Sequence, residues 1–342
     1  MDAIVLVGGL GTRLRPLTDT RHKSLVPVCN RPAIDYLFDW VRRAGIDRVV
    51  LALGVHNEDL ARTYPPGTYD GLEIAVVTEH ARLESGGAIR NAVREAGIEG
   101  RFLVLNGDVF FDFDLRSALQ AHESRKADLT LALCEVDEPW SFGVAAVDSD
   151  GMVTGFVEKP PPGTEPSNLV NAGAWIFEPG LVDEIPRGAV RVEETLFPSL
   201  VARQRRVFGF RYQGVWADIG TPARYLALNR RLIEREGASA IAAGAAIEPG
   251  AVVLTSSVGS GCTVASGAHI ENSILWEGVS VGRGALVADS ILADGVSIGA
   301  DARVSAAVIG SGAVIGPSAV VPAGTLIEPR ARYDAGDDHK SR

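Results

Sequence analysis

The chain has 342 residues, of which 46% are apolar and 22% charged, and its formal net charge at pH 7 is −10. This composition is that of a globular protein and excludes a disordered, collagen-like or coiled-coil chain; at about 150 residues per domain, the length predicts two domains. The acidic balance disfavours nucleic acid as a partner, so a phosphate-bearing ligand would need a local positive site.

The terminal and cysteine patterns indicate a cytoplasmic chain with no membrane partner. No apolar run approaches the ~18 residues that a transmembrane helix needs. The segment from Met1 to Leu10 has no basic residue and is not a signal peptide. Cys29, Cys134 and Cys262 are too far apart to suggest a disulfide framework or a metal site.

Residues 1–236 alternate short β-branched runs with helical patterns. The predicted strands are 3–7, 48–53, 74–78, 102–105 and 129–134, and the predicted helices are 32–44, 88–96 and 115–122. Strands separated by helices predict a Rossmann-like α/β fold, with a mainly parallel sheet and helices on both faces. Ligands of such sheets bind beyond the carboxyl ends of the strands.

A repeat replaces this pattern over residues 237–330. Apolar residues recur every 17 positions in three columns, which begin at Ile247, Val253 and Val258. Three columns per period predict three short strands per coil, stacked as a parallel β-helix of hexapeptide type with about five coils. We expect its charge-poor surface to join subunits into a dimer or tetramer, and residues 331–342 to form a polar tail that frays.

A glycine-rich loop follows the first predicted strand directly. Gly8, Gly9 and Gly11 allow backbone N–H groups to approach an anion, and Arg13 and Lys23 add positive charge nearby. The spacing matches neither the dinucleotide-binding glycine motif nor a P-loop. By itself the loop is compatible with a nucleotide site or with a tight structural turn.

A longer set of motifs resembles the sugar-1-phosphate nucleotidyltransferase family. These motifs are Gly8–Thr18, Lys23–Val28, Arg31-Pro32, Asn106-Gly107-Asp108, Phe142-Gly143, Glu158-Lys159-Pro160, Asn171-Ala172-Gly173 and Trp216–Pro222. The resemblance spans nearly the whole chain, and the bacterial mannose-1-phosphate guanylyltransferases (GDP-mannose pyrophosphorylases) are the most similar subgroup. Long members of the family also end in a β-helix, which we expect here to be left-handed.

The resemblance implies roles for four charged residues. Arg13 and Lys23 would bind the triphosphate and act in catalysis together with Asp108, while Asp108 and Asp218 would hold Mg²⁺, which favours hard oxygen ligands. Two structural alternatives remain open. Asp108 could be a turn residue, and Asp218 could cap a helix that begins near Pro222.

The resemblance also implies the rest of the binding site. The nucleotide-binding residues would be Gly8, Gly9, Gly11, Thr12, Arg13, Glu79, Gly86 and Gly87. The sugar phosphate would be bound by Gly143, Glu158, Lys159 and Asn171, with Glu193 close by, although Glu158 and Lys159 could instead be a solvated pair. Glu84 and Ser85 depart from the base-recognition loop typical of guanylyltransferases. Glu79 or Glu84 would accept the hydrogen bonds of guanine.

The implied reaction joins a nucleoside triphosphate to a sugar 1-phosphate and releases pyrophosphate. GTP and mannose 1-phosphate, giving GDP-mannose, are the expected substrates, and Mg²⁺ is the expected cofactor. The alternatives are a uridylyl- or thymidylyltransferase acting on glucose 1-phosphate or a related sugar, and a regulatory paralogue that binds nucleotide-sugars. Acyl transfer by the β-helix is a third alternative, for which His269 is the candidate base.

Overall fold

The computed structural model describes residues 1–55 and 57–337 and divides the chain into two compact units. The first unit comprises residues 1–9 and 34–216, and the second comprises residues 10–33 together with the chain from residue 217 onward. The glycine-rich loop is thus shared between the units. The domain boundary expected near residue 236 lies inside the second unit.

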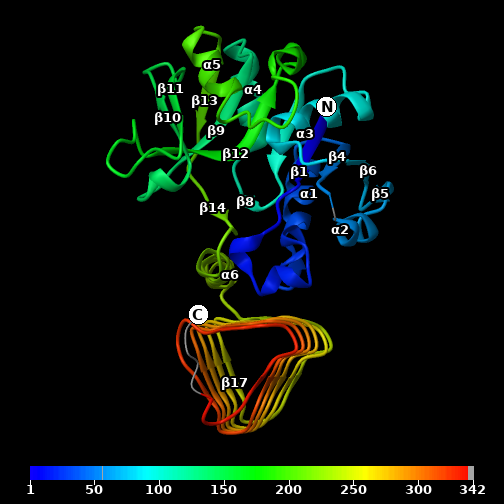
Figure 1. Cartoon of the computed structure of the whole chain (residues 1–342), viewed down its shortest axis with the longest axis vertical. Helices are drawn as coiled ribbons and strands as arrows, with labels where there is room; N and C mark the ends of the chain where they lie inside the picture. The colour runs from blue at the N-terminus through cyan, green and yellow to red at the C-terminus, as the bar shows by residue number, and fades with distance from the viewer. Residues whose placement is uncertain (56, 338–342) are drawn as a thin grey trace. The chain divides into compact units, whose positions relative to one another are not determined.

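The first unit holds a mixed sheet with the strand order β11–β10–β12–β7–β1–β4–β6–β5, and β9 connects β12 to β13 (Figure 1). Its strands are β1 (Asp2–Val7), β4 (Arg48–Leu53), β5 (Gly67–Tyr69), β6 (Leu72–Thr78), β7 (Phe102–Asn106), β9 (Leu129–Glu135), β10 (Gly143–Val147), β11 (Val153–Glu158), β12 (Leu169–Phe177) and β13 (Val207–Arg211). Two short strands, β8 (Val109–Phe111) and β14 (Trp216–Asp218), lie outside this sheet.

The centre of the sheet is parallel, as predicted. Strand β1 pairs in parallel with β4 and β7, and β4 with β6. Beyond β7 the direction changes, because β12 runs antiparallel to both β7 and β9, and β10 and β11 form an antiparallel pair. Only a few residues connect β10 to β11, which is too short for a parallel crossover. The carboxyl ends of β1, β4, β6 and β7 therefore meet at one edge.

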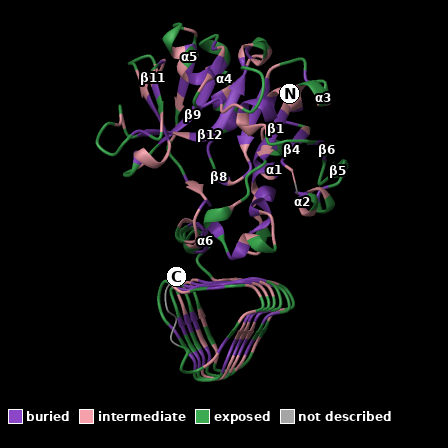
Figure 2. Cartoon of the chain, in the orientation of Figure 1, coloured by how far each residue is buried: buried purple, intermediate pink, exposed green. Residues whose placement is uncertain are grey.

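The helices of the first unit cover this sheet. They are α1 (Ala33–Arg43), α2 (Glu58–Thr63), α3 (Glu84–Ala96), α4 (Leu115–Ser124) and α5 (Leu196–Ala202). Helix α3 packs on β1, β4 and β6, while α4 packs on β9 and β13. Figure 2 shows that the buried residues of this unit are concentrated in the strands of the sheet. Within the described residues, no helix is long and apolar enough to cross a membrane.

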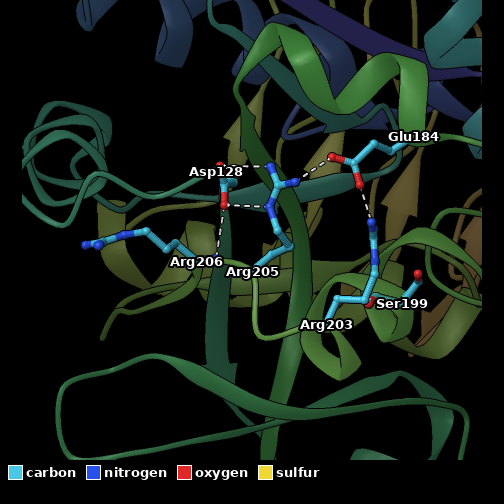
Figure 3. Close-up of polar contacts among 6 residues, drawn as sticks. All are labelled: Asp128, Glu184, Ser199, Arg203, Arg205 and Arg206. Carbon is cyan, nitrogen blue, oxygen red and sulfur yellow. Dashed lines mark hydrogen bonds and ion pairs between the residues drawn. The ribbon is translucent and has the colours of Figure 1, made fainter.

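An ion-pair network closes the amino ends of β9 and β13, opposite the carboxyl edge (Figure 3). The Arg205 guanidinium donates two hydrogen bonds to Asp128, of 3.0 and 3.1 Å, and one of 2.9 Å to Glu184. Glu184 also accepts a 2.6 Å hydrogen bond from Arg203. The hydrogen bond from Arg205 lowers the pKa of Asp128. These charged groups pair with one another, so we assign the network a structural role, which is to hold the amino ends of β9 and β13 together.

Burial of His122 is expected to make the stability of the folded chain depend on pH. The His122 ring is fully buried between Thr130 Oγ1, at 2.8 Å, and Glu178 Oε1, at 3.1 Å, and burial lowers its pKa. The unfolded chain takes up a proton below about pH 6.5, while the folded chain resists it. The free energy of unfolding should therefore fall as the pH drops through that value.

Urea unfolding of the wild-type chain and His122→Gln, at several pH values between about 7.5 and 5.5, tests this prediction. Glutamine keeps polar atoms in the same place and cannot be protonated, so the variant should lose less stability over this range. Equal pH dependence in the two proteins would contradict the assignment.

In the second unit, the segment 10–33 forms three short 3₁₀ helices and a hairpin. They are η1 (Thr12–Leu14), η2 (Leu17–Asp19), η3 (Lys23–Leu25), β2 (Pro27–Val28) and β3 (Arg31–Pro32). The hairpin packs on α6 (Pro222–Glu236), where the Cys29 N–H donates to Asn229 Oδ1 at 2.8 Å. The Asn30 side chain donates to the carbonyls of Ala240 and Val258 in the first β-helix strands. The segment is thus tied to both α6 and the β-helix.

The rest of the second unit is the expected parallel β-helix, with three faces that enclose one apolar core (Figure 1). One face holds β15 (Ala240–Ile241), β18 (Ser257–Val258), β21 (Ile274–Leu275), β24 (Ile291–Leu292), β27 (Val308–Ile309) and β30 (Leu326–Ile327). The second holds β16 (Ala246–Ile247), β19 (Thr263–Val264), β22 (Ser280–Val281), β25 (Ser297–Ile298), β28 (Val314–Ile315) and β31 (Arg332–Tyr333). The third holds β17 (Val252–Leu254), β20 (His269–Glu271), β23 (Leu286–Ala288), β26 (Arg303–Ser305) and β29 (Val320–Val321).

The three apolar columns seen in the sequence are the inward positions of these faces. Ile247 pairs with Val264, and Val258 with Leu275, in parallel register. The β-helix continues into the segment expected to be a tail, because β31 pairs with β28 and buries Tyr333 in the core. Residues 338–342 of that expected tail lie outside the described residues.

Candidate functional site

The carboxyl edge of the sheet brings two glycines into backbone contact. Gly8 follows β1 and Gly54 follows β4, and a Cβ on Gly54 would lie 2.8 Å from Gly8 Cα. Only glycine allows this approach, so Gly54 shapes the predicted nucleotide loop, a role that the sequence analysis missed. Glu79 follows β6, and its Oε1 lies 3.9 Å from where a Cβ on Gly8 would be. The predicted nucleotide loop and Glu79 therefore meet at this edge.

Glu79 and Glu84, the two candidate base acceptors, have different surroundings. The Glu79 side chain is buried, and its Oε2 accepts a 3.0 Å hydrogen bond from the N–H of Leu83. Burial raises the pKa of Glu79. Glu84 instead forms a 2.8 Å ion pair with the exposed side chain of Arg82. Glu79 is thus the better placed of the two to meet a ligand at the glycine loop.

Gly86 and Gly87 lie inside α3, which begins four residues before the predicted start at 88. The N–H of Gly86 donates to the carbonyl of Val190 at 2.8 Å, and a Cβ on Gly87 would lie 2.7 Å from the carbonyl oxygen of Gly188. Both glycines therefore allow the first turn of α3 to pack on the segment before Arg191. This packing accounts for their lack of side chains, and their contact with a nucleotide stays a prediction.

The predicted sugar-phosphate residues form a second cluster in the first unit. Gly143 pairs with Glu158 across β10 and β11, and a Cβ on Gly143 would lie 2.7 Å from Glu158 Oε2. Lys159 Nζ lies 3.5 Å from Glu158 Oε1, and Arg191 Nη2 lies 4.0 Å from the same atom. Burial and the charge of Glu193 raise the pKa of Glu158. The Glu158 side chain is only 13% exposed, whereas that of Lys159 is 55% exposed, so only the lysine end of the pair is solvated.

Ser85 connects this cluster to the start of α3. Its hydroxyl donates to Glu193 Oε2 at 2.5 Å and accepts from the N–H of Val192 at 3.1 Å. Ser85 was singled out in the sequence only as a departure from the family pattern, and Arg191 was not singled out at all. No local motif marks either residue, because Glu193 lies 108 positions from Ser85 and Glu158 lies on a different element from Arg191.

Asn171 supports a β-bulge. Its Oδ1 accepts from the N–H of Gly173 at 3.1 Å and from Trp175 Nε1 at 2.6 Å, where the register of β12 shifts. A Cβ on Gly173 would lie 2.7 Å from Asn106 Nδ2, so the bulge packs against the Asn106-Gly107-Asp108 motif. Asp108 lies in the turn between β7 and β8 and is partly exposed. Contact of Asn171 with a sugar stays a prediction.

In the second unit, Asp218 is surrounded by cations. Lys23 Nζ lies 3.8 Å from its Oδ1, and Arg224 Nη1 lies 3.0 Å from its Oδ2. A Cβ on Gly220 would lie 2.6 Å from Asp218 Oδ1 and 2.9 Å from Arg13 Nη2, so both side chains reach this glycine. Three cationic groups gather around one carboxylate. We call Arg13, Lys23, Asp218 and Arg224 the cationic cluster; Arg224 was missed in the sequence.

The local structure explains why these side chains converge. Thr221, not Asp218, caps α6, because the Thr221 hydroxyl accepts from the N–H of Arg224. The helix-cap alternative for Asp218 is therefore excluded. Gly11 has a φ of 61°, and the Thr18 hydroxyl donates to its carbonyl at 2.8 Å. This turn brings the loop back onto Lys23, which is buried. Gly9 and Thr12 are exposed on the same loop.

The predicted metal ligands are the two carboxylates of Asp108 and Asp218. Asp108 belongs to the first unit and Asp218 to the second. Across residues 1–55 and 57–337, no group of three or more His, Cys, Asp or Glu side chains could hold a metal ion. Two carboxylates are hard oxygen ligands of the type Mg²⁺ prefers, and Mg²⁺ commonly takes its remaining ligands from phosphates and water. The metal pair itself stays a prediction.

Fold and site together define a class of protein: an α/β protein with cationic side chains gathered at one carboxylate, followed in the chain by a parallel β-helix. Comparison with known families identifies it further. Residues 2–235 match the nucleotidyl transferase family, and residues 229–322 match the family described as the eIF2B subunit epsilon LbH domain. The chain belongs to the nucleotidyl transferase family, which confirms the family resemblance seen in the sequence. The second match agrees with the predicted left-handed β-helix.

Several known proteins are similar to the chain. A mannose-1-phosphate guanylyltransferase of Mycobacterium tuberculosis is 35% identical over 74% of the chain and 73% of that relative. A mannose-1-phosphate guanylyltransferase catalytic subunit beta of Xenopus tropicalis is 34% identical over 66% of the chain, which spans 63% of that relative. Among solved structures, HddC from Yersinia pseudotuberculosis has a TM-score of 0.57 and 24% identity, and covers 68% of the chain and 99% of its own. This last match shows the fold alone.

Proposed function

We propose that the chain transfers a nucleotidyl group from a nucleoside triphosphate to a sugar 1-phosphate and releases pyrophosphate. The observation that carries this proposal is the cationic cluster, in which Arg13, Lys23 and Arg224 gather at the carboxylate of Asp218. Such a concentration of positive charge on an otherwise acidic chain suits a polyphosphate. The nucleotidyl transfer that the family performs needs this type of site.

Each residue of the proposed site has its own role in the transfer reaction. A phosphate oxygen of the sugar 1-phosphate attacks the α-phosphorus of the triphosphate, and the bond to the leaving pyrophosphate breaks. Arg13 and Lys23 offset the negative charge of the triphosphate and of the leaving group. Lys159 binds the sugar's phosphate, and Glu158 accepts hydrogen bonds from sugar hydroxyls. Mg²⁺ held by Asp108 and Asp218 would supply further charge neutralisation on the phosphates.

We propose GTP and mannose 1-phosphate as the substrate pair. The similar guanylyltransferases support this choice, and so does Glu79, a buried carboxylate beside the glycine loop. A carboxylate accepts from the ring N–H and the exocyclic amine of guanine, a donor pair that uracil and thymine lack. A buried polar group left unpaired costs about 1–3 kcal/mol, so this contact discriminates between bases.

A pyrophosphate-release screen of nucleoside triphosphates against several sugar 1-phosphates tests both levels of the proposal. The highest kcat/KM is expected for GTP with mannose 1-phosphate. A preference for UTP or dTTP with every sugar would overturn the guanylyl assignment and leave nucleotidyl transfer standing. No pyrophosphate release with any pair, together with binding of a nucleotide-sugar, would identify a regulatory paralogue instead.

Replacing Glu79 by glutamine should weaken GTP selectively. The amide has one acceptor atom where the carboxylate has two, so kcat/KM for GTP should fall by about 10- to 100-fold, as expected for one or two lost hydrogen bonds. Because the pKa of Glu79 is raised, protonation removes its acceptor function at a higher pH than for an ordinary glutamate. The wild-type kcat/KM for GTP should therefore decline on the acid side.

The Glu79→Gln variant should lack that acid decline. Glu84→Gln, which changes a neighbouring glutamate that is paired with Arg82, serves as the matched control and should keep the wild-type pH profile. An unchanged GTP kcat/KM in Glu79→Gln would remove Glu79 from base recognition.

We further propose that the chain forms a homo-oligomer through its β-helix. Four large apolar side chains are exposed on the face that holds β17, β20, β23, β26 and β29: Val252, Leu254, Leu286 and Val320. A second copy would cover them. Sedimentation should give a dimer or tetramer, and Leu286→Glu should shift it toward the monomer. A wild-type chain that sediments as a monomer would refute this proposal.

A further inference from the structure

Arg21 connects the loop of the cationic cluster to the side of the β-helix. It lies two residues before Lys23, on the same loop. Its guanidinium contacts both oxygens of Asp294, at 3.1 and 3.0 Å, and lies over the ring of Trp276, 5.0 Å from its centroid. Asp294 and Trp276 belong to different coils of the β-helix. A single nitrogen, Arg21 Nη2, donates to both carboxylate oxygens, and together with the cation–π contact it holds the guanidinium against the β-helix.

Further contacts hold the loop on either side of Arg21. The Trp276 ring is 1% exposed, and its Nε1 donates to the Tyr225 hydroxyl at 3.1 Å. The Tyr225 hydroxyl in turn donates to the carbonyl of Pro27, just beyond η3. The Thr20 and Ser311 hydroxyls form a 2.9 Å hydrogen bond. The loop is thus attached to α6 and to several coils, on both sides of Lys23.

We propose that Asp294 and Trp276 are positioning residues of the β-helix, which act through Arg21 to hold Lys23 and Arg13 in place for polyphosphate. The segment 10–33 contains only short 3₁₀ helices and a hairpin whose two strands have two residues each. Such short elements are not stable by themselves and need contacts with the rest of the protein. Charge stabilisation requires donors held within a fraction of an ångström of their working positions. If the proposed function holds, the β-helix therefore contributes to catalysis by positioning the cationic cluster.

The inference rests on the proposed function for its kinetic consequence, whereas its structural part can be measured without turnover. Hydrogen exchange of the full-length chain, with and without Asp294→Ala, reports directly on the segment 10–33. We expect faster exchange in this segment and unchanged exchange in β1 and β7. Unchanged exchange in residues 10–33 would overturn the proposal whether or not the protein is an active transferase.

Binding of inorganic tripolyphosphate, measured by calorimetry without metal, tests the link to the cationic cluster. Arg21→Ala and Asp294→Ala should each weaken binding by about 10-fold, the loss expected of a displaced charged donor. The double variant should bind no more weakly than either single variant, because both remove the same contact. Asp294→Asn keeps an acceptor for the Glu277 N–H and should show a smaller loss, even if the alanine variant folds poorly.

Arg332→Ala is the matched control, because it removes a 2.6 Å ion pair with Asp334 on the last coil, far from the loop in the chain. It should leave tripolyphosphate binding and turnover unchanged. In pyrophosphate-release assays, Arg21→Ala and Asp294→Ala should lower kcat as well as raise KM for the triphosphate. KM for the sugar 1-phosphate should stay constant. The proposal would be overturned if the losses of tripolyphosphate affinity were additive in the double variant, or if they equalled the loss in Arg332→Ala. The contact between Arg21 and Asp294 would then only stabilise the fold.

Discussion

Replacing Asp218 by alanine is expected to lower Mg²⁺-dependent turnover by about 1,000-fold or more, since losing a metal ligand removes several kcal/mol of transition-state stabilisation. The same change should strengthen tripolyphosphate binding without metal. Asp218 offsets part of the charge of Lys23 and Arg224, which lie 3.8 and 3.0 Å away. Removing it leaves these cations with less competition for an anion. Pyrophosphate release and calorimetry in EDTA measure the two opposite effects.

Asp108→Ala should lose turnover to a similar extent. It should not strengthen tripolyphosphate binding, because Asp108 is not part of the cationic cluster. Asp19→Ala is the control, because Asp19 lies on the same loop as Lys23 and pairs with the exposed Arg15 at 3.0 Å. It should keep near wild-type turnover. All three variants should still unfold cooperatively on heating, and Asp218→Ala should have the lowest midpoint because it removes a carboxylate beside the buried Lys23. Near-normal turnover in Asp218→Ala would refute its assignment as a metal ligand.

Replacing Lys23 by methionine should lower kcat by about 100- to 1,000-fold, the range observed when one donor to a developing charge is removed. Methionine fills a similar volume in a site where Lys23 is 7% exposed, so the fold should survive. Tripolyphosphate binding should also weaken, which is the opposite of its response in Asp218→Ala. The opposite changes in tripolyphosphate affinity distinguish Lys23, which binds phosphate, from Asp218, which binds the metal.

Lys23→Arg should restore little of the lost activity, because a planar guanidinium does not fit a buried site shaped for an ammonium group. Arg15→Met removes an exposed cation from the same loop and serves as the control. If Arg15→Met and Lys23→Met lose turnover equally, the effect belongs to the net charge of the loop. Lys23 would then have no specific role.

Local periodicity made much of the fold predictable. The strand predicted at 48–53 coincides with β4, because a β-branched run at the centre of a parallel sheet is buried on both faces. The column containing Ile247 and Val264 predicted the β-helix register, since each coil repeats the same inward positions. The segment 88–96 was recognised as helical, but the start of α3 was missed. Gly86 and Gly87 resemble loop residues until the packing of the segment 185–190 against them is known.

The candidate site was predictable to a different extent. Motifs marked Arg13, Lys23 and Asp218, because the residue types and their order resemble a known family, and the structure brings these three together. Arg224 and Arg191 carried no such mark. A surface arginine on a helix or in a loop is common, and only its distance to Asp218 or Glu158 gives it a role.

The sequence alone predicted the chemistry of the site and the architecture of each part. Residue types and short periods are local properties, and they specify strands, coils and the charges that a phosphate needs. Contacts between distant segments explain why residues 10–33 belong to the same unit as α6 and the β-helix, although they directly follow β1 in the chain. That outcome depends on contacts such as Arg21 with Asp294, which are 273 positions apart. No local pattern encodes such a pair, because its stability arises only when both segments are already folded.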